Sequence, residues 1–262
     1  MRMLTIGSTG PEVKTLQTGL NLLPSELVQL AVDGIFGLKT FERVKEYQVL
    51  MKIVVDGIVG RQTWNTMEIL LGLLDRIVQT NQSRDKIVSV AKKEAEGQGM
   101  LVHAKRRGAL DAGKNKYFRA GHTQLLEYFR KAAPDPNNPG KTFFTEDDIA
   151  YLSQENQLSP CPSWCGIFAL WAYKAANIQV GNWILGCGID SVQRFKRIHY
   201  PQKGDIGYVG GPYQHMVLIE RVYLLRGWTM IDTIEGNSEP DSAIQKKKRS
   251  KTEILSFYSA FL

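Results

Sequence analysis

A cysteine at the start of a predicted helix is the strongest candidate for chemistry in this sequence. Cys165 follows Pro162 and Ser163, two residue types that favour a helix start, and the apolar residues after it are spaced to bury one helical face. A thiol in the first helical turn lies at the positive end of the helix dipole, which lowers its pKa towards the reactive thiolate. The unpaired N–H groups of the same turn are suited to hold an oxyanion during acyl transfer.

A catalytic thiol also needs a base to accept its proton, and His215 is the best placed of the four histidines. His215 begins a strand-like run over residues 216–222, where a sheet edge would hold the imidazole rigidly. The other three histidines lie in basic or helical stretches and are predicted to be surface residues: His103, His122 and His199.

A third group must orient the base, and two candidates follow the next predicted strand. Residues 228–234 run into Glu235 and Asn237 just after a turn. In antiparallel neighbours the start of one strand pairs with the end of the next, so either side chain would lie beside His215. The sequence leaves the choice between Glu235 and Asn237 open.

The N-terminal part of the chain contains a repeat. Residues 32–40 and 55–63 share the pattern V-D-G-I-x-G-x-x-T, in which Asp-Gly suits a tight turn and the second glycine permits an unusual backbone angle. Helical patterns precede, separate and follow the two copies, and they predict three short helices. The residues that carry these patterns are Val13, Leu16, Gln17 and Leu20, then Phe41, Val44, Tyr47 and Gln48, then Trp64, Met67 and Leu71.

Together these motifs resemble the peptidoglycan-binding domain type 1 family over residues 4 to about 72. The resemblance rests on G-x-x-G-x-x-V-x-x-L-Q, then V-D-G-I-F-G-x-x-T, then D-G-I-V-G-x-x-T-W. It implies a three-helix fold and non-catalytic attachment to peptidoglycan. Turn chemistry accounts for Asp33 and Asp56, so neither is predicted to contact a ligand.

The second half of the chain resembles the CHAP amidase family of papain-like cysteine peptidases, over about residues 84–262. The motifs are W-C-G-x-F at the helix start, P-x-x-G-D-I over 201–206, a strand opening with histidine, and I-E-G-N-S. The resemblance implies hydrolysis of a peptidoglycan amide with Cys165 as nucleophile, His215 as base, and Glu235 or Asn237 as orienting residue. Many members have Gly-Gln before the cysteine, whereas Ser163-Trp164 stand here, so no oxyanion side chain is assigned.

We expect two domains and an α+β fold. Residues 72–81 change from apolar to polar, and Ser83 is predicted to begin a new helix that stops at Gly97, which places a boundary near residue 78. The predicted domains are a small three-helix unit, residues 1–75, and a papain-like α+β unit, residues 80–262, with a helix-borne cysteine and an antiparallel sheet.

The charge and cysteine content exclude several classes of protein. The net charge of +7 and the run Lys246–Lys251 favour an anionic partner, although that run alone is predicted to be a solvated basic surface loop. Three cysteines at no zinc-like spacing argue against a disulfide framework and a metal site, and Cys161 and Cys187 are predicted to be structural. No cofactor is expected.

No stretch reaches the length of a membrane span, and no signal peptide is recognised, so we expect synthesis in the cytoplasm, no stable membrane insertion, and action at the cell wall or periplasm. The expected partner is peptidoglycan, and the expected state a monomer. Two kinds of protein fit these expectations: a phage endolysin, and an antibacterial effector that is delivered to the wall and has a cognate immunity protein. The alternatives are an inactive wall-binding or structural phage protein and, more weakly, a nucleic-acid-binding protein.

Overall fold

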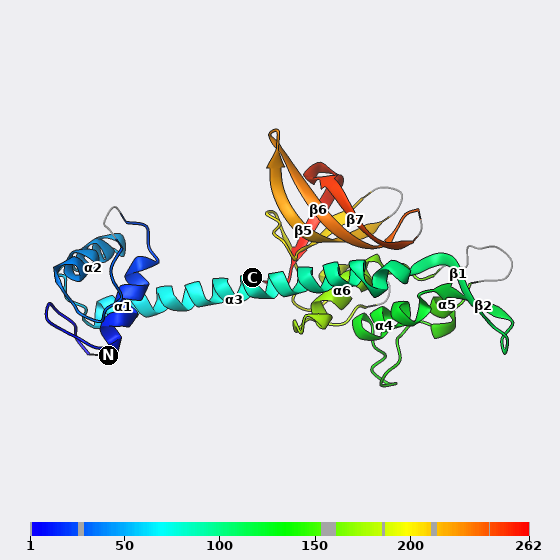
Figure 1. Ribbon diagram of the computed structural model, residues 1–262, viewed down its shortest axis with the longest axis horizontal. Coiled ribbons are helices and arrows are strands. Elements are labelled where there is room, and N and C mark those ends of the chain that lie inside the picture. Colours follow the sequence, from blue (N-terminus) through cyan, green and yellow to red (C-terminus); the bar gives the residue numbers. More distant parts are fainter. Residues whose placement is uncertain are drawn as a thin grey trace. The chain divides into compact units, whose positions relative to one another are not determined.

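The computed structural model describes residues 2–25, 29–152, 161–184, 187–210, 214–240 and 242–261, and the chain divides into two compact units, Met1–Gln79 and Thr80–Leu262. The first unit is helical, and the second combines helices with an eight-stranded antiparallel sheet (Figure 1). The predicted α+β class is therefore confirmed. Within the described part of the chain, no helix is long and apolar enough to cross a membrane.

The three predicted N-terminal helices are present. They are α1 (Pro11–Asn21), α2 (Leu38–Leu50) and the first turns of α3 (Arg61–Glu96). Pro11 occupies the first turn of α1, where its missing N–H leaves no helical hydrogen bond unmade. The core of this unit includes apolar residues that carried the periodicity, among them Leu16, Leu20, Val44, Trp64 and Met67.

A buried glutamine closes each copy of the repeat. Gln17 donates from Nε2 to Asp33 Oδ1 at 2.8 Å, and Gln48 donates in the same way to Asp56 Oδ1 at 2.9 Å. Each aspartate also accepts the backbone N–H two residues further on, at 2.8 Å in both copies. Both carboxylates are thus engaged within their own turns, the role the sequence predicted for them.

Helix α3 differs from the prediction. A new helix was expected to begin at Ser83, whereas α3 continues without interruption from Arg61 to Glu96. The segment contains no proline, and Gly72 is its one glycine; a single helical glycine costs about 1 kcal/mol relative to alanine and does not by itself end a helix. The predicted stop at Gly97 is correct, because α3 ends at Glu96.

The sheet of the second unit has the order β2-β1-β7-β6-β5-β4-β8-β3, and all neighbours are antiparallel. The strands are β1 (His103–Asp111), β2 (Lys116–Ala120), β3 (Lys196–Ile198), β4 (Ile206–Val209), β5 (His215–Leu225), β6 (Trp228–Ser238), β7 (Ala243–Ser250) and β8 (Ile254–Ser259). The remaining helices are α4 (His122–Ala132), α5 (Glu146–Ala150), α6 (Cys165–Ala175) and the short 3-10 turns η1 (Gln98–Leu101), η2 (Ile189–Ser191) and η3 (Lys251–Glu253).

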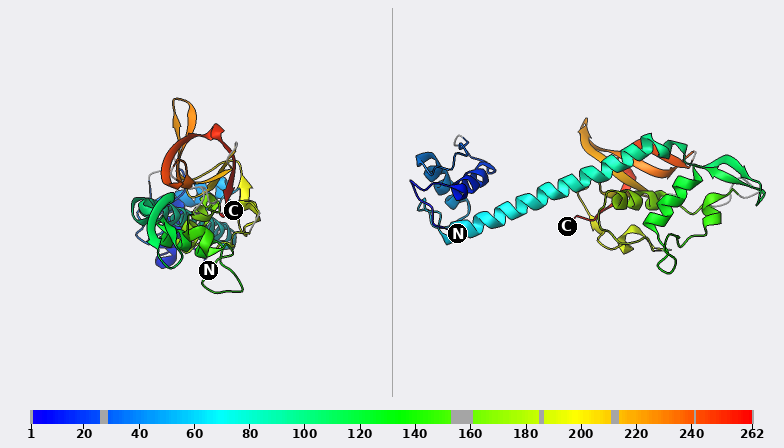
Figure 2. Two further views of the ribbon diagram at one scale, coloured as in Figure 1. Left: turned by 90° about the vertical axis from the view of Figure 1, so that its right-hand side faces the viewer. Right: turned by 60° about the horizontal axis from the view of Figure 1, so that its bottom comes forward.

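The two faces of the sheet bury different clusters. Leu218 and Ile234 belong to the large core that also contains apolar residues of α4 and α6. Their strand neighbours Val217, Ile219 and Ile231 belong to a second cluster on the opposite face, because successive side chains of a strand alternate between faces. Figure 2 shows how strongly the strands twist and curl. Strand β7 carries most of the basic run, Lys246–Lys251, so the prediction of a solvated loop is wrong there.

A buried ion pair ties α3 to the sheet within the second unit. Arg84 Nη1 donates to Asp205 Oδ1 at 2.6 Å and to the carbonyl of Lys203 at 2.9 Å, while Nη2 donates to Ser259 at 3.0 Å. The two side chains are 5% and 0% exposed. Asp205 is the acid of the P-x-x-G-D-I motif, which accordingly has a structural role in this chain.

Breaking this pair should destabilise the second unit. Arg84→Ala leaves the Asp205 carboxylate buried without its counter-ion, and we expect a loss of about 3–5 kcal/mol in the free energy of unfolding, measured by urea denaturation. Lys203→Ala is the matched control, because the Lys203–Asp85 pair is exposed and should cost less than about 1 kcal/mol. Equal losses from the two variants would contradict the assignment.

Candidate active site

Cys165 is the first residue of α6, as the sequence predicted. Its side chain is buried, and the residue is 6% exposed. The thiol shares hydrogen bonds with the imidazole of His215 and with the backbone of Met216, and its sulfur lies 3.5 Å from Ser163 Oγ. The nucleophile predicted from a helix start and the base predicted from a strand start are therefore in contact.

His215 is the first residue of β5 and pairs with Val209 of β4 across the sheet. Its Nε2 lies 3.0 Å from Glu235 Oε2. Because Nε2 is engaged by the carboxylate, Nδ1 is the ring nitrogen left to exchange a proton with the thiol. The imidazole is thereby held between the Cys165 thiol and the Glu235 carboxylate.

Of the two candidates for the orienting residue, Glu235 and not Asn237 contacts the imidazole of His215. Glu235 is completely buried on β6. The ladder between β6 and β7 is irregular between Glu235 and Ser238, and Asn237 has a left-handed backbone with φ 55°. The side-chain oxygen of Asn237 accepts a hydrogen bond from Ser242 instead. Asn237 still lines the cavity beside His215, so it belongs to the walls of the site.

Arg249 also belongs to this site, although its place there was not predicted from the sequence. This residue of β7 donates from Nε to Glu235 Oε1 at 2.6 Å and from Nη2 to Oε2 at 2.7 Å, a bidentate pair. It lay within a basic run that offers no apolar alternation, so no local pattern indicated an inward-facing side chain. The available signal was indirect, because a buried carboxylate beside a histidine requires a counter-cation.

The charges of the site favour a thiolate. Burial alone would raise the pKa of Glu235, but hydrogen bonds from Arg249, His215 and Thr233 outweigh it and lower that pKa to about 2. Burial would lower the pKa of His215, yet its hydrogen bonds with Cys165 and Glu235 raise it to about 9. Burial likewise opposes ionisation of Cys165, and the hydrogen bond with His215 overcomes it and lowers the thiol pKa. All three shifts are in the direction that favours a thiolate–imidazolium pair beside an ionised carboxylate.

Two glycines allow the helix and the sheet to approach closely enough for this contact. A Cβ on Gly236 of β6 would lie 2.5 Å from Phe168 Cβ and 2.8 Å from Trp164 Cζ3. A Cβ on Gly166 of α6 would lie 2.4 Å from the ring of Trp183. Any larger residue at either position would push β6 or the Trp183 segment away from the start of α6.

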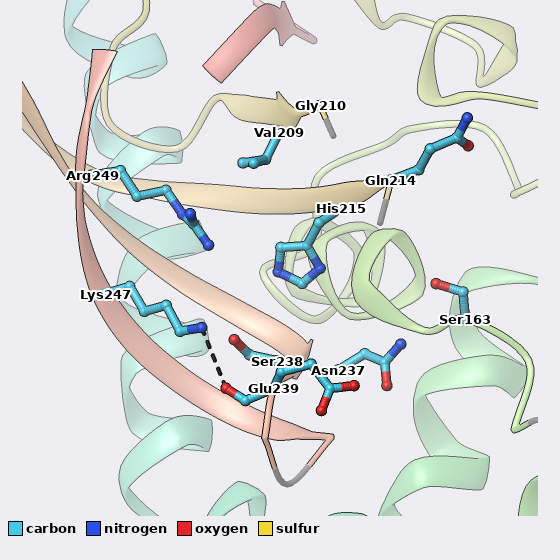
Figure 3. A pocket seen from close by; sticks show the side chains of 10 residues that line it. All are labelled: Ser163, Val209, Gly210, Gln214, His215, Asn237, Ser238, Glu239, Lys247 and Arg249. Atoms are coloured by element: carbon cyan, nitrogen blue, oxygen red, sulfur yellow. Dashed lines mark hydrogen bonds between the residues drawn. The ribbon is translucent and has the colours of Figure 1, made fainter. Parts of the chain in front are cut away.

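A cavity opens on each side of the Cys165–His215 pair. One, of about 510 Å³, is lined by His215 together with Asn237, Ser238, Glu239, Lys247 and Arg249 (Figure 3). The other, of about 490 Å³, is lined by Cys165 together with Trp183, Asp190, Tyr208 and Tyr258. Ser163 and Gln214 line both cavities. We call them the histidine-side and cysteine-side cavities.

The two other cysteines, and two of the other histidines, have surroundings of a different kind. His103 Nε2 lies 2.9 Å from the carbonyl of Met100, and His122 stacks on Phe118 with ring centroids 4.0 Å apart. Burial raises the pKa of Cys161 to about 11, which disfavours its thiolate. Cys187 is exposed and lines the outer wall of the cysteine-side cavity.

The ionisation of Cys165 should depend on His215. With Cys161 and Cys187 replaced by serine, alkylation of Cys165 by iodoacetamide should stay fast from neutral pH upwards, because the imidazolium holds the thiolate. His215→Ala removes the main contact that opposes burial and leaves those with Ser163 and Met216, so the thiol pKa rises and the rate at pH 7 falls about tenfold or more. His122→Ala is the control, and an unchanged rate profile in His215→Ala would remove His215 from the site.

Arg249 should be needed to keep Glu235 ionised. In Arg249→Met burial dominates, the pKa of Glu235 rises, and the carboxylate becomes protonated as the pH falls through that raised value. The pH below which the alkylation rate of Cys165 falls should therefore be higher in Arg249→Met than in the parent. In Arg249→Lys, which retains the charge but not the bidentate geometry, this pH should be intermediate. Lys248→Met on the same strand is the matched control. An unchanged pH dependence of the alkylation rate in Arg249→Met would show that the arginine only packs against the site.

Comparison with known proteins adds one family match, and it lies in the N-terminal unit. Residues 9–67 match the family described as "Putative peptidoglycan binding domain". No curated protein matches the chain. A solved structure, the crystal structure of Burkholderia AP3 phage endolysin, aligns with 22% sequence identity and a TM-score of 0.24 over 49% of this chain and 47% of that chain. The chain thus spans about half of that protein, and its peptidoglycan-binding segment is the part assigned to a known family.

Proposed function

We propose that this chain hydrolyses an amide bond in peptidoglycan through an acyl-enzyme formed on Cys165. The observation that carries the proposal is the connected set Cys165–His215–Glu235–Arg249, which opens onto two cavities and favours the thiolate. The family match of the N-terminal segment indicates peptidoglycan as the substrate. A wall-binding segment on the same chain would hold the site close to this immobile polymer and raise the rate at which the site meets it. The motif resemblance to CHAP amidases supports the same chemistry.

The proposed reaction uses the groups of this set in turn. The Cys165 thiolate attacks the carbonyl carbon, the carbon–sulfur bond forms, and the negative charge moves to the carbonyl oxygen, where first-turn N–H groups of α6 can stabilise it. The intermediate collapses, the carbon–nitrogen bond breaks, and the His215 imidazolium gives its proton to the departing amine. Water, deprotonated by the neutral imidazole, then attacks the thioester and releases the carboxylic acid and the thiol.

Two bonds fit this chemistry, the N-acetylmuramoyl-L-alanine amide and an amide within the peptide part. Both are cleaved by the same acyl-enzyme route, and both suit a phage endolysin or an antibacterial effector acting at the wall. An inactive wall-binding protein is the less favoured alternative, because it would have no need to keep a buried carboxylate, its arginine and the thiolate-favouring histidine together. Nucleic-acid binding is also disfavoured, because Arg249 and Lys246 of the basic strand are engaged by Glu235 and Glu96.

Replacement of the nucleophile tests the proposal. Cys165→Ala should abolish release of fragments from purified sacculi while leaving the thermal transition intact, whereas Cys187→Ala, the matched control, should retain most activity. Mass spectrometry of the released fragments identifies the bond in the same experiment. Fragment release that survives in Cys165→Ala would contradict a cysteine mechanism, and no release by the unaltered chain would contradict the hydrolase assignment.

A further inference from the structure

The two cavities are not equivalent with respect to the bond that the proposed function breaks. His215 lines one cavity and Cys165 the other. The imidazolium must reach the departing nitrogen to protonate it, so the amine half of the substrate lies on the histidine side. The acyl half remains bonded to sulfur and lies on the cysteine side. This orientation rests on the proposed function.

Among the described residues that line the histidine-side cavity, one positive charge has no carboxylate partner. Arg249 is neutralised by Glu235, and Glu239 is held by both of its oxygens, at 2.6 and 2.7 Å, by Lys105. The imidazolium of His215 is balanced by the thiolate. Lys247 is left over: within the part of the chain that the structure describes, its ammonium donates only to the backbone carbonyl of Glu239, at 3.4 Å (Figure 3).

Lys247 is directed into the cavity by the alternation of β7. It stands two residues before Arg249, so both side chains extend from the same face of the strand, as Figure 3 shows. The polar side chains of Asn237 and Ser238 line the same cavity, so an anion there would meet hydrogen-bonding groups as well as the charge. Lys248 lies between the two basic residues, is exposed and does not line the cavity.

The cysteine-side cavity has the opposite character. Trp183, Tyr208 and Tyr258 form aromatic walls, and Asp190 is the one carboxylate among its described lining residues, with no lysine or arginine beside it. A carboxylate would be repelled there by Asp190 and by the thiolate. The charge pattern therefore assigns a carboxylate to one side of the scissile bond.

We propose that the histidine-side cavity is a carboxylate-binding subsite in which Lys247 recognises the amine half of the substrate. The substrate class is then an amide whose departing amine bears a free carboxylate close to the new amino group, such as an acidic amino acid or a peptide ending in one. Lys247 acts as a specificity residue, and the chemistry of bond cleavage does not require it.

The first test uses alkylation of Cys165 and does not depend on wall hydrolysis. The rates with anionic iodoacetate and neutral iodoacetamide are compared in the full chain with Cys161 and Cys187 replaced by serine. Lys247→Gln should lower the iodoacetate-to-iodoacetamide rate ratio by about threefold or more, because an attractive charge is lost. Lys248→Gln removes the same charge from the outward face and should leave the ratio unchanged. Equal changes in both variants, or none in Lys247→Gln, would overturn the subsite.

The second test uses soluble wall fragments, either native or with their carboxylates converted to amides. For native fragments Lys247→Gln should raise KM about tenfold with kcat within about twofold, and for amidated fragments it should match the parent. A KM effect that persists on amidated fragments would overturn the carboxylate assignment. If the parent cleaves neither kind of fragment, the proposed function fails, while the alkylation ratio still decides whether Lys247 attracts a carboxylate to the site.

Discussion

The buried carboxylate of Glu235 is the charge on which the site depends. A carboxylate removed from water is strongly destabilising unless it is paired. Here Arg249 donates hydrogen bonds to both oxygens of Glu235, and His215 contacts one of the same oxygens. The contacts of Glu235, above all with Arg249, favour its ionised form, and an ionised Glu235 favours the imidazolium. The imidazolium in turn favours the thiolate of a cysteine that burial alone would keep neutral. Each group in the series compensates the desolvation of the next.

This series requires that α6 and β6 approach more closely than side chains normally permit. Gly236 permits that approach, since a Cβ there would overlap Phe168 and Trp164, and Gly166 lets Trp183 lie against the start of α6. The Arg84–Asp205 pair in addition fastens α3 to the loop before β4. The P-x-x-G-D-I and I-E-G-N-S motifs therefore have packing roles as well as the chemical role of Glu235.

The polar side chains have different roles in the two units. In the first, each repeat uses one glutamine to satisfy an aspartate and the backbone of a tight turn, and this places the helices around a small apolar core. In the second, the sheet separates two apolar clusters, and polar residues of β5 and β7, among them His215 and Arg249, line a cavity. Under the proposed function, binding and chemistry would occupy separate parts of one chain, the arrangement expected of an enzyme that acts on an insoluble polymer.

Features that depend on neighbouring residues could be read from the sequence alone. The helix start at Cys165, the strand start at His215, the turns of the repeat and the end of α3 at Gly97 all follow from caps, turn chemistry and periodicity within a few residues. The continuity of α3 through Ser83 was not predictable in the same way, because a serine is compatible with both a cap and a helix interior.

Features that depend on pairing between distant strands were decided by the tertiary structure. The choice of Glu235 over Asn237 follows from the irregularity that gives Asn237 a left-handed backbone. The inward direction of Arg249 and Lys247 follows from the register of β7 against β6, which a run of basic residues does not encode locally. Strand register fixes which face every second side chain occupies, so the partners of a buried charge became visible only when the sheet was assembled.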